Sequence, residues 1–125
     1  MAANSNALEL FKRAIGAKIT ELTGLSDVYY ERCRDATYPR IVYTTTVWVS
    51  DNTLKGTLSC TIAGNGSASE VDGLQQLLLT ELDGFSSCSD NLMYYLHSGR
   101  GTPVEETDKT VHRRLVTFDF DVMGG

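Results

Sequence analysis

The spacing of the apolar residues restricts the fold of this chain more than any other feature of the sequence. Between Ser5 and Thr23 the large apolar side chains recur at steps of three and four residues: Leu8, Phe11, Ile15, Ile19 and Leu22. This spacing is typical of the buried stripe of an amphipathic helix. Ser5 or Asn6 can cap the start of that helix, and Gly24 can end it without a steric penalty. The first element is therefore predicted to be a helix.

After this helix the apolar residues mostly recur at every second position, which is the period of a β-strand. The alternating or β-branched runs are Val28–Arg32, Arg40–Val49, Leu54–Ile62, Asn91–His97 and Val111–Val122. The second and third runs are joined by the polar turn 50–53, so they are expected to pair as an antiparallel hairpin. Gly56 is expected to weaken the third run and to mark a bulge.

A second helical stripe lies between the third and fourth runs, after a break at Gly64-Asn65-Gly66. Its apolar members are Val71, Leu74, Leu77, Leu78, Leu82 and Phe85. Ser67 or Ser69 can cap this helix, and Glu70 and Asp72 complement its positive N-terminal dipole. The predicted order is helix, three strands, helix, two strands, which indicates an α+β fold with two helices on a mostly antiparallel sheet of about five strands.

The segment Ser98–Thr110 reads SGRGTPVEETDKT and mixes glycine, proline and charged residues. Such a composition predicts an exposed, mobile loop. With 125 residues and no linker between two apolar patterns, the chain is expected to form one domain over residues 1–125.

The cysteines Cys33, Cys60 and Cys88 are widely spaced and have no CxxC pair or histidine cluster beside them. We expect reduced thiols and no zinc site. The first residues lack a basic and apolar signal pattern, and Leu77-Leu78-Leu79 is too short to cross a bilayer, so we expect neither secretion nor a membrane span.

The chain carries 16 acidic and 11 basic side chains, a net charge of −5. A general nucleic-acid-binding protein usually has a basic surface that displaces phosphate counterions, so this balance argues against that class. A ring of acidic subunits is instead suited to let DNA pass without binding it.

Three groups of residues could carry chemistry, and each has a structural explanation as well. Residues 64–67, before a helix, can bind an anion but lack the lysine of a nucleotide loop. Asp119 and Asp121 project from one face of a strand, yet no further ligand accompanies them for a divalent cation. His97 and His112 flank the charged loop, and either could act as a general base if a nucleophile and an orienting carboxylate lay within hydrogen-bond reach; the alternative is a hairpin-end histidine near solvent. No cofactor, metal site or catalytic residue is therefore predicted, and the chain is not expected to be an enzyme.

The layout of the chain resembles the tail terminator, or tail completion, proteins of long-tailed bacteriophages. The resemblance rests on the N-terminal amphipathic helix, on Tyr38-Pro39-Arg40-Ile41-Val42-Tyr43 entering a strand, on the central helix, and on the late charged stretch leading into Arg113-Arg114-Leu115-Val116-Thr117-Phe118-Asp119-Phe120. It covers nearly the whole chain and is one of layout and short patterns.

The resemblance implies a structural virion protein, made in the host cytoplasm, that forms a homo-oligomeric, hexameric ring at the head–tail junction. Such a ring ends growth of the tail tube and receives the head connector or head-closure protein, while DNA passes through it without specific binding. It implies that the loop Ser98–Thr110 contacts a neighbour and that the polar face of the last strand faces a channel or an adjacent subunit. The interface candidates are Arg100, Glu105, Glu106, Asp108, Lys109, Arg113 and Arg114, and the channel or inter-subunit candidates are Thr117, Asp119 and Asp121.

Two alternatives remain open at this point. One is a head-closure or other head–tail connector component with a similar small α+β fold. The other is a small cytosolic α+β enzyme or ligand-binding domain that uses the histidines or the Asp119–Asp121 pair.

Overall fold

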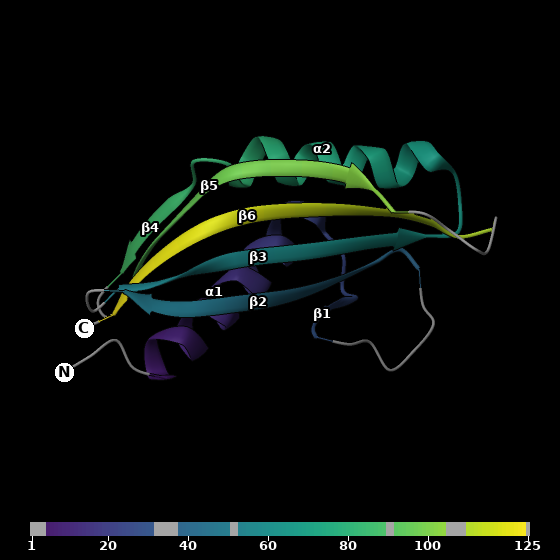
Figure 1. Ribbon diagram of the computed structural model, residues 1–125. Coiled ribbons are helices and arrows are strands. Elements are labelled where there is room, and N and C mark those ends of the chain that lie inside the picture. The colour runs from purple at the N-terminus through teal and green to yellow at the C-terminus, as the bar shows by residue number, and fades with distance from the viewer. Residues whose placement is uncertain (1–4, 32–37, 51–52, 90–91, 105–109, 125) are drawn as a thin grey trace.

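The chain folds into a curved sheet with both helices on one face (Figure 1). The computed structural model describes residues 5–31, 38–50, 53–89, 92–104 and 110–124. In chain order its elements are α1 (Ser5–Thr23), β1 (Val28–Tyr30), β2 (Arg40–Ser50), β3 (Thr53–Gly64), α2 (Ala68–Leu82), β4 (Ser86–Ser89), β5 (Leu92–Pro103) and β6 (His112–Gly124). The α+β class is confirmed, but the sheet has six strands, and the order gains one strand after α2. Neither helix has the length and apolarity needed to span a membrane.

The strands are ordered β1-β2-β3-β6-β5-β4 across the sheet. β1 is parallel to β2, and every other neighbouring pair is antiparallel. The predicted hairpin is confirmed, since β2 and β3 pair continuously from Arg40 opposite Ala63 to Ser50 opposite Thr53. The two central strands β3 and β6 are therefore hydrogen-bonded on both sides, whereas β1 and β4 form the short edges.

α1 has the predicted bounds, because its apolar stripe and its stop signal agree. Phe11, Ile15 and Ile19 are fully buried, and Gly24 follows the helix with a φ of 72°. This left-handed conformation is open to glycine without strain. The Tyr43 hydroxyl donates a 2.9 Å hydrogen bond to the Lys12 carbonyl, which fixes α1 against β2.

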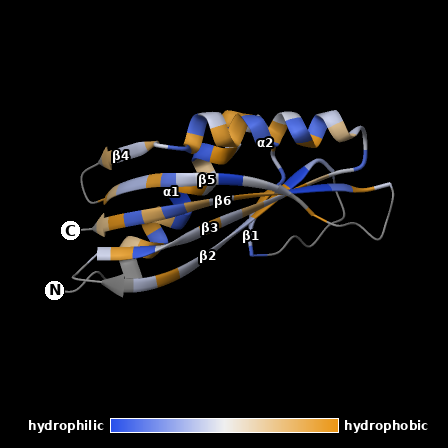
Figure 2. Cartoon of the chain, turned by 45° about the horizontal axis from the view of Figure 1, so that its top comes forward, coloured by the Kyte–Doolittle hydropathy of each residue, from blue (hydrophilic) through white to orange (hydrophobic). Residues whose placement is uncertain are grey.

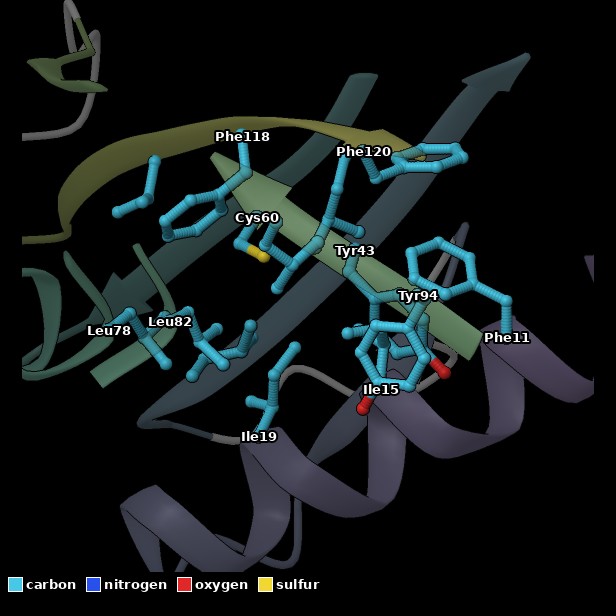
Figure 3. Close-up of a cluster of buried hydrophobic side chains, with 14 of the residues drawn as sticks. Phe11, Ile15, Ile19, Tyr43, Cys60, Leu78, Leu82, Tyr94, Phe118 and Phe120 are labelled. Carbon is cyan, nitrogen blue, oxygen red and sulfur yellow. The ribbon is translucent and has the colours of Figure 1, made fainter. Parts of the chain in front are cut away.

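Hydrophobic and hydrophilic residues alternate along the strands, as the banded colouring of Figure 2 shows. Because successive side chains of a strand point to opposite faces, the apolar ones gather on one face of the sheet. The buried side chains of the apolar face are Ile41, Tyr43, Leu54, Leu58, Cys60, Ile62, Leu92, Tyr94, Leu96, Val116, Phe118, Phe120 and Val122. Figure 3 shows Phe11, Ile15 and Ile19 of α1 and Leu78 and Leu82 of α2 directed toward this face. The Phe11 ring lies 4.5 Å from the Phe120 ring and 5.2 Å from the Tyr94 ring, measured between centroids.

α2 begins where the sequence predicts, although its cap works differently. Ser67 is the N-cap residue, but its side chain makes no capping hydrogen bond to the backbone. Its hydroxyl instead lies 2.9 Å from that of Ser69. Val71, Leu78 and Leu82 are buried against the sheet. Phe85 lies beyond the helix and packs against the edge of the core.

The loop predicted for Ser98–Thr110 is wrong in its first half, because β5 continues to Pro103. Ser98, with a φ of 57°, marks an irregularity in the β5–β6 register, after which pairing resumes with Arg100 opposite Thr117. The α2 side chain of Gln75 donates to the Leu115 carbonyl at 3.1 Å, so the helix packs over this stretch. Residues 105–109 lie outside the described residues.

β4 was also missed, since Ser86–Ser89 has no apolar alternation. Its strand conformation comes from pairing with the first residues of β5, from Ser86 opposite Tyr95 to Ser89 opposite Leu92. A strand that forms only because a neighbour pairs with it need not show alternating apolar residues in its sequence.

Gly56 does not mark a bulge, because β3 pairs regularly with both neighbours at this position. A β-carbon on Gly56 would instead collide with the Thr46 carbonyl and would lie 2.7 Å from the Phe120 ring. Glycine is needed here because the Phe120 ring takes the space above the strand.

Replacement of Gly56 by alanine should therefore destabilise the protein by about 1–3 kcal/mol, as overpacking of a filled core does. Gly73 of α2 is the matched control, since nothing lies within 4 Å of a β-carbon placed there. Gly73→Ala should stabilise the protein by about 0.5–1 kcal/mol through helix propensity. Denaturant unfolding of both variants measures the difference, and a Gly56→Ala variant as stable as the parent would contradict the packing argument.

Cys60 is fully buried, and desolvation raises the pKa of its thiol from 9.0 to about 12. The unfolded thiol thus ionises before the folded one. The stability that follows from this difference is complete below pH 9.0 and is lost as the pH rises toward about 12.

At pH 10 the Cys60 thiol alone should lower the free energy of unfolding by about 1.4 kcal/mol relative to neutral pH. Chemical denaturation at several alkaline pH values tests this, with Cys60→Ala as the comparison. That variant should be less stable at neutral pH, because it leaves a cavity, but its stability should fall less steeply with pH. Equal slopes for the parent and the variant would rule out Cys60 as the source.

Candidate functional site

The face of the sheet turned away from the helices carries the candidate residues, and we call it the open face. It is formed by the side chains that alternate with those of the core. These are Thr44, Thr46 and Trp48 of β2, Lys55, Thr57 and Ser59 of β3, Thr117, Asp119, Asp121 and Met123 of β6, and Met93, Tyr95 and His97 of β5. The candidates Thr117, Asp119 and Asp121 all lie in its central strand β6.

The two aspartates of the open face are held by cations from the neighbouring strands. Lys55 Nζ lies 3.5 Å from Asp121 Oδ1, and Arg100 Nη2 lies 3.7 Å from Asp119 Oδ1. His97 Nε2 is 3.8 Å from Asp121 Oδ2. The Thr57 hydroxyl donates a 3.4 Å hydrogen bond to Asp119 Oδ1. Asp119 and Asp121, which were predicted to project from one face of the strand, are therefore part of a mixed-charge network across β3, β6 and β5.

A hollow of about 210 Å³ lies within this network and is lined by Trp48, Lys55, Gly56, His97, Asp119, Phe120 and Asp121. Its volume is smaller than the several hundred Å³ typical of ligand pockets, and the hollow is open to solvent on one side. The Tyr95 ring stacks on the His97 ring at a centroid distance of 5.1 Å beside it.

The network does not favour a divalent cation at Asp119 and Asp121. Lys55 and Arg100 already lie against the two carboxylates. Among the residues that the structure describes, no three histidine, cysteine or acidic side chains gather in a metal-binding group. Hard cations usually need several oxygen ligands, and this pair supplies too few.

The two histidines do not form one site. His97 is opposite Asp119 in the β5–β6 register, whereas His112 begins β6 and is opposite Gly64. Seven residue steps along β6 separate His112 from Asp119, roughly 24 Å at the usual rise of a strand. His97 takes part in the open-face network, and His112 lies at the other end of the sheet.

The residues 64–67 are not arranged for an anion. The Glu70 carboxylate of α2 lies over both glycines, 2.9 Å from the position of a β-carbon on Gly64 and 3.5 Å from that on Gly66. A negative charge thus already occupies the region above the turn.

The interface candidates separate into three groups. Arg100 is exposed on β5 and pairs with Asp119. Arg114 is largely buried, and its Nε donates a 2.7 Å hydrogen bond to Asp72, so it joins β6 to α2. Arg113 is partly exposed at the start of β6. Glu105, Glu106, Asp108 and Lys109 lie outside the part of the chain that the structure describes, as does Cys33.

One feature of the open face was not predicted, namely a group of exposed large apolar side chains at one end of the sheet. Trp48, Met93, Tyr95 and Met123 are 52%, 43%, 44% and 49% exposed. We call them the apolar end. Met93 is opposite Met123, and Tyr95 is opposite Asp121. Asp121 is opposite Lys55, which is opposite Trp48. The members of the group therefore come from three strands, β2, β5 and β6, and Lys55 and Asp121 lie between Trp48 and Tyr95. The signal was present in the sequence, because each of these residues alternates with a core position of its own strand.

Comparison with models of known protein families and with curated proteins found no match for this chain. The functional argument therefore rests on the sequence and on the geometry of the open face.

The double variant Asp119→Asn, Asp121→Asn should fold and should differ from the parent by less than about 1 kcal/mol, because exposed ion pairs contribute little. The small difference should shrink as salt is added. Thermal unfolding at low and high ionic strength measures both effects. Added Mg²⁺ or Ca²⁺ should leave the melting temperature of the parent unchanged; a rise that the double variant lacks would establish a cation site.

Proposed function

We propose that this chain is a tail terminator subunit of a long-tailed bacteriophage, a structural protein that forms a ring at the head-proximal end of the tail. The ring would end polymerisation of the tail tube and offer the surface to which the head connector joins. The proposal combines the chain-wide resemblance in sequence layout with the character of the open face.

The observation that carries the assembly role is the apolar end of the open face. An antiparallel sheet can expose one face to water, but that face is usually polar. Here Trp48, Met93, Tyr95 and Met123 together expose aromatic and thioether groups at one end. Tryptophan, tyrosine and methionine are enriched in the cores of protein interfaces. A surface that contacts other protein subunits explains this arrangement.

The charges of the open face agree with DNA passing by without binding. Lys55 and Arg100 lie against the carboxylates of Asp121 and Asp119, so neither cation stands alone in the network. Binding to phosphates requires cations that can replace condensed counterions. Paired cations on an acidic chain, with a net charge of −5, attract a phosphate backbone weakly.

The purified protein should form rings of one size and should bind to one end of tail tubes from the phage that encodes it. Light scattering measures the mass of the assembly, and negative-stain microscopy shows its shape and its place on the tube. Tubes assembled with the protein present should stop at a defined end, because a capped end no longer accepts tube subunits.

A chain that remains monomeric and never binds tube ends would refute this proposal. Immunogold labelling of whole particles separates it from the connector alternative. Label at the last ring of the tail supports a terminator, and label within the neck next to the portal supports a head-closure component.

A further inference from the structure

Beyond the ring itself, we infer that copies of this chain join edge to edge, with β4 of one copy added to the outer edge of β2 of the next. The inference rests on the proposed ring for the identity of the partner, a second copy of this chain. It concerns two strand edges that the fold leaves open.

The first open edge is the second half of β2. β1 pairs with β2 only at Ile41, Val42 and Tyr43, and the Tyr43 carbonyl accepts the last bond, from the amide of Glu31. Alternate residues of a strand direct their backbone groups to opposite sides. The amides and carbonyls of Thr45 and Val47 therefore point away from β3, and no described strand pairs with them.

The second open edge is β4, on the other side of the sheet. The Phe85 carbonyl accepts a hydrogen bond from the Leu96 amide, so the backbone groups of Phe85 point toward β5. Because the direction alternates along a strand, those of Ser87 point toward β5 as well. The backbone groups of Ser86 and Cys88 consequently point outward, again with no described strand beside them.

The two edges match in position and direction. Following the strand registers across the sheet from Trp48 through Lys55, Asp121 and Tyr95 leads to Ser86, so β4 lies at the same level as the end of β2. Figure 1 shows both at the same end of the molecule, on opposite sides of the sheet. Successive antiparallel pairings also give β4 the same direction as β2. A copy placed beside another in the same orientation thus brings β4 alongside β2 as a parallel strand.

The side chains favour this contact as well. Neither Thr44–Ser50 nor Ser86–Ser89 contains a charged residue, and an uncharged, β-branched edge is a good template for strand addition. In this parallel pairing the open faces of the two copies lie on the same side, so that Cys88 and Met93 of one copy are on the same face as Trp48 of the next. The apolar end of each copy then continues into that of its neighbour, which shields Trp48 from water.

The contact is head to tail, because it joins two different edges. Heterologous contacts of this kind close into a ring when the rotation between copies allows it. The curved sheet supplies a rotation, and each copy uses one edge on either side.

Disulfide trapping tests the pairing directly, with native Cys88 as one partner. Trp48→Cys, combined with Cys33→Ser, places a second thiol on the same face, while the fully buried Cys60 stays out of reach. Mild oxidation should produce a ladder of linked copies with this variant. Peptide mapping should find Cys88 bonded to the introduced thiol, and the same variant with Cys88→Ser should give no ladder beyond dimers.

A charge placed at the β2 edge is the second test. Val47→Lys should reduce self-association to monomers at concentrations where Thr80→Lys, an exposed control on α2, remains associated. Circular dichroism checks that both variants fold.

The outcomes separate this inference from the proposed function. If the protein self-associates but Cys88 does not become linked and Val47→Lys has no effect, the edge pairing is overturned, whereas the proposed ring is not. A chain that stays monomeric and unlinked at every concentration, as it would if the edge accepted only a segment of another protein, overturns the assignment to a second copy. Linked copies that never cap a tail tube support the pairing and refute the terminator role.

Discussion

The structure depends on the burial of one sheet face by the stripe of α1. Phe11 packs against both Phe120 and Tyr94, which belong to β6 and β5. This contact fixes which face of those strands points inward, because a slip of one residue would turn every core side chain to the solvent. The position of Phe120 in turn requires glycine at position 56 of β3. The alternation that buries Phe118 and Phe120 also places Thr117, Asp119 and Asp121 outside.

Much of the fold could be predicted from the sequence, because several local signals agreed with each other. In α1 the apolar stripe, the length and the Gly24 stop all indicated the same helix. β4 and the second half of β5 carry no such signal. Ser86–Ser89 is extended because β5 offers it a pairing partner, and 98–103 stays in the sheet because β6 and Gln75 of α2 hold it. The spacing of apolar residues within one segment cannot reveal which distant segments pair with it or pack against it.

The candidate site shows the same division. The outward direction of Asp119 and Asp121 follows from alternation within one strand and was predicted. Their partners Lys55 and Arg100 come from two other strands, so only the register could identify them. For this reason the two aspartates proved to be part of a mixed-charge network. The apolar end was missed for a related reason: Trp48, Met93, Tyr95 and Met123 belong to three strands, and only the register brings them to the same end of the sheet.

The shortness of β4 has a consequence for how this protein can be built into a larger structure. Its four residues present outward backbone groups only at Ser86 and Cys88. A strand added there gains few hydrogen bonds, each contributing about 0.5–1.5 kcal/mol net. A single joint is thus weak and reversible, and a wrongly placed copy can leave again. Lasting attachment requires that a subunit be held on both sides at once, which a closed structure achieves and an open row of copies does not.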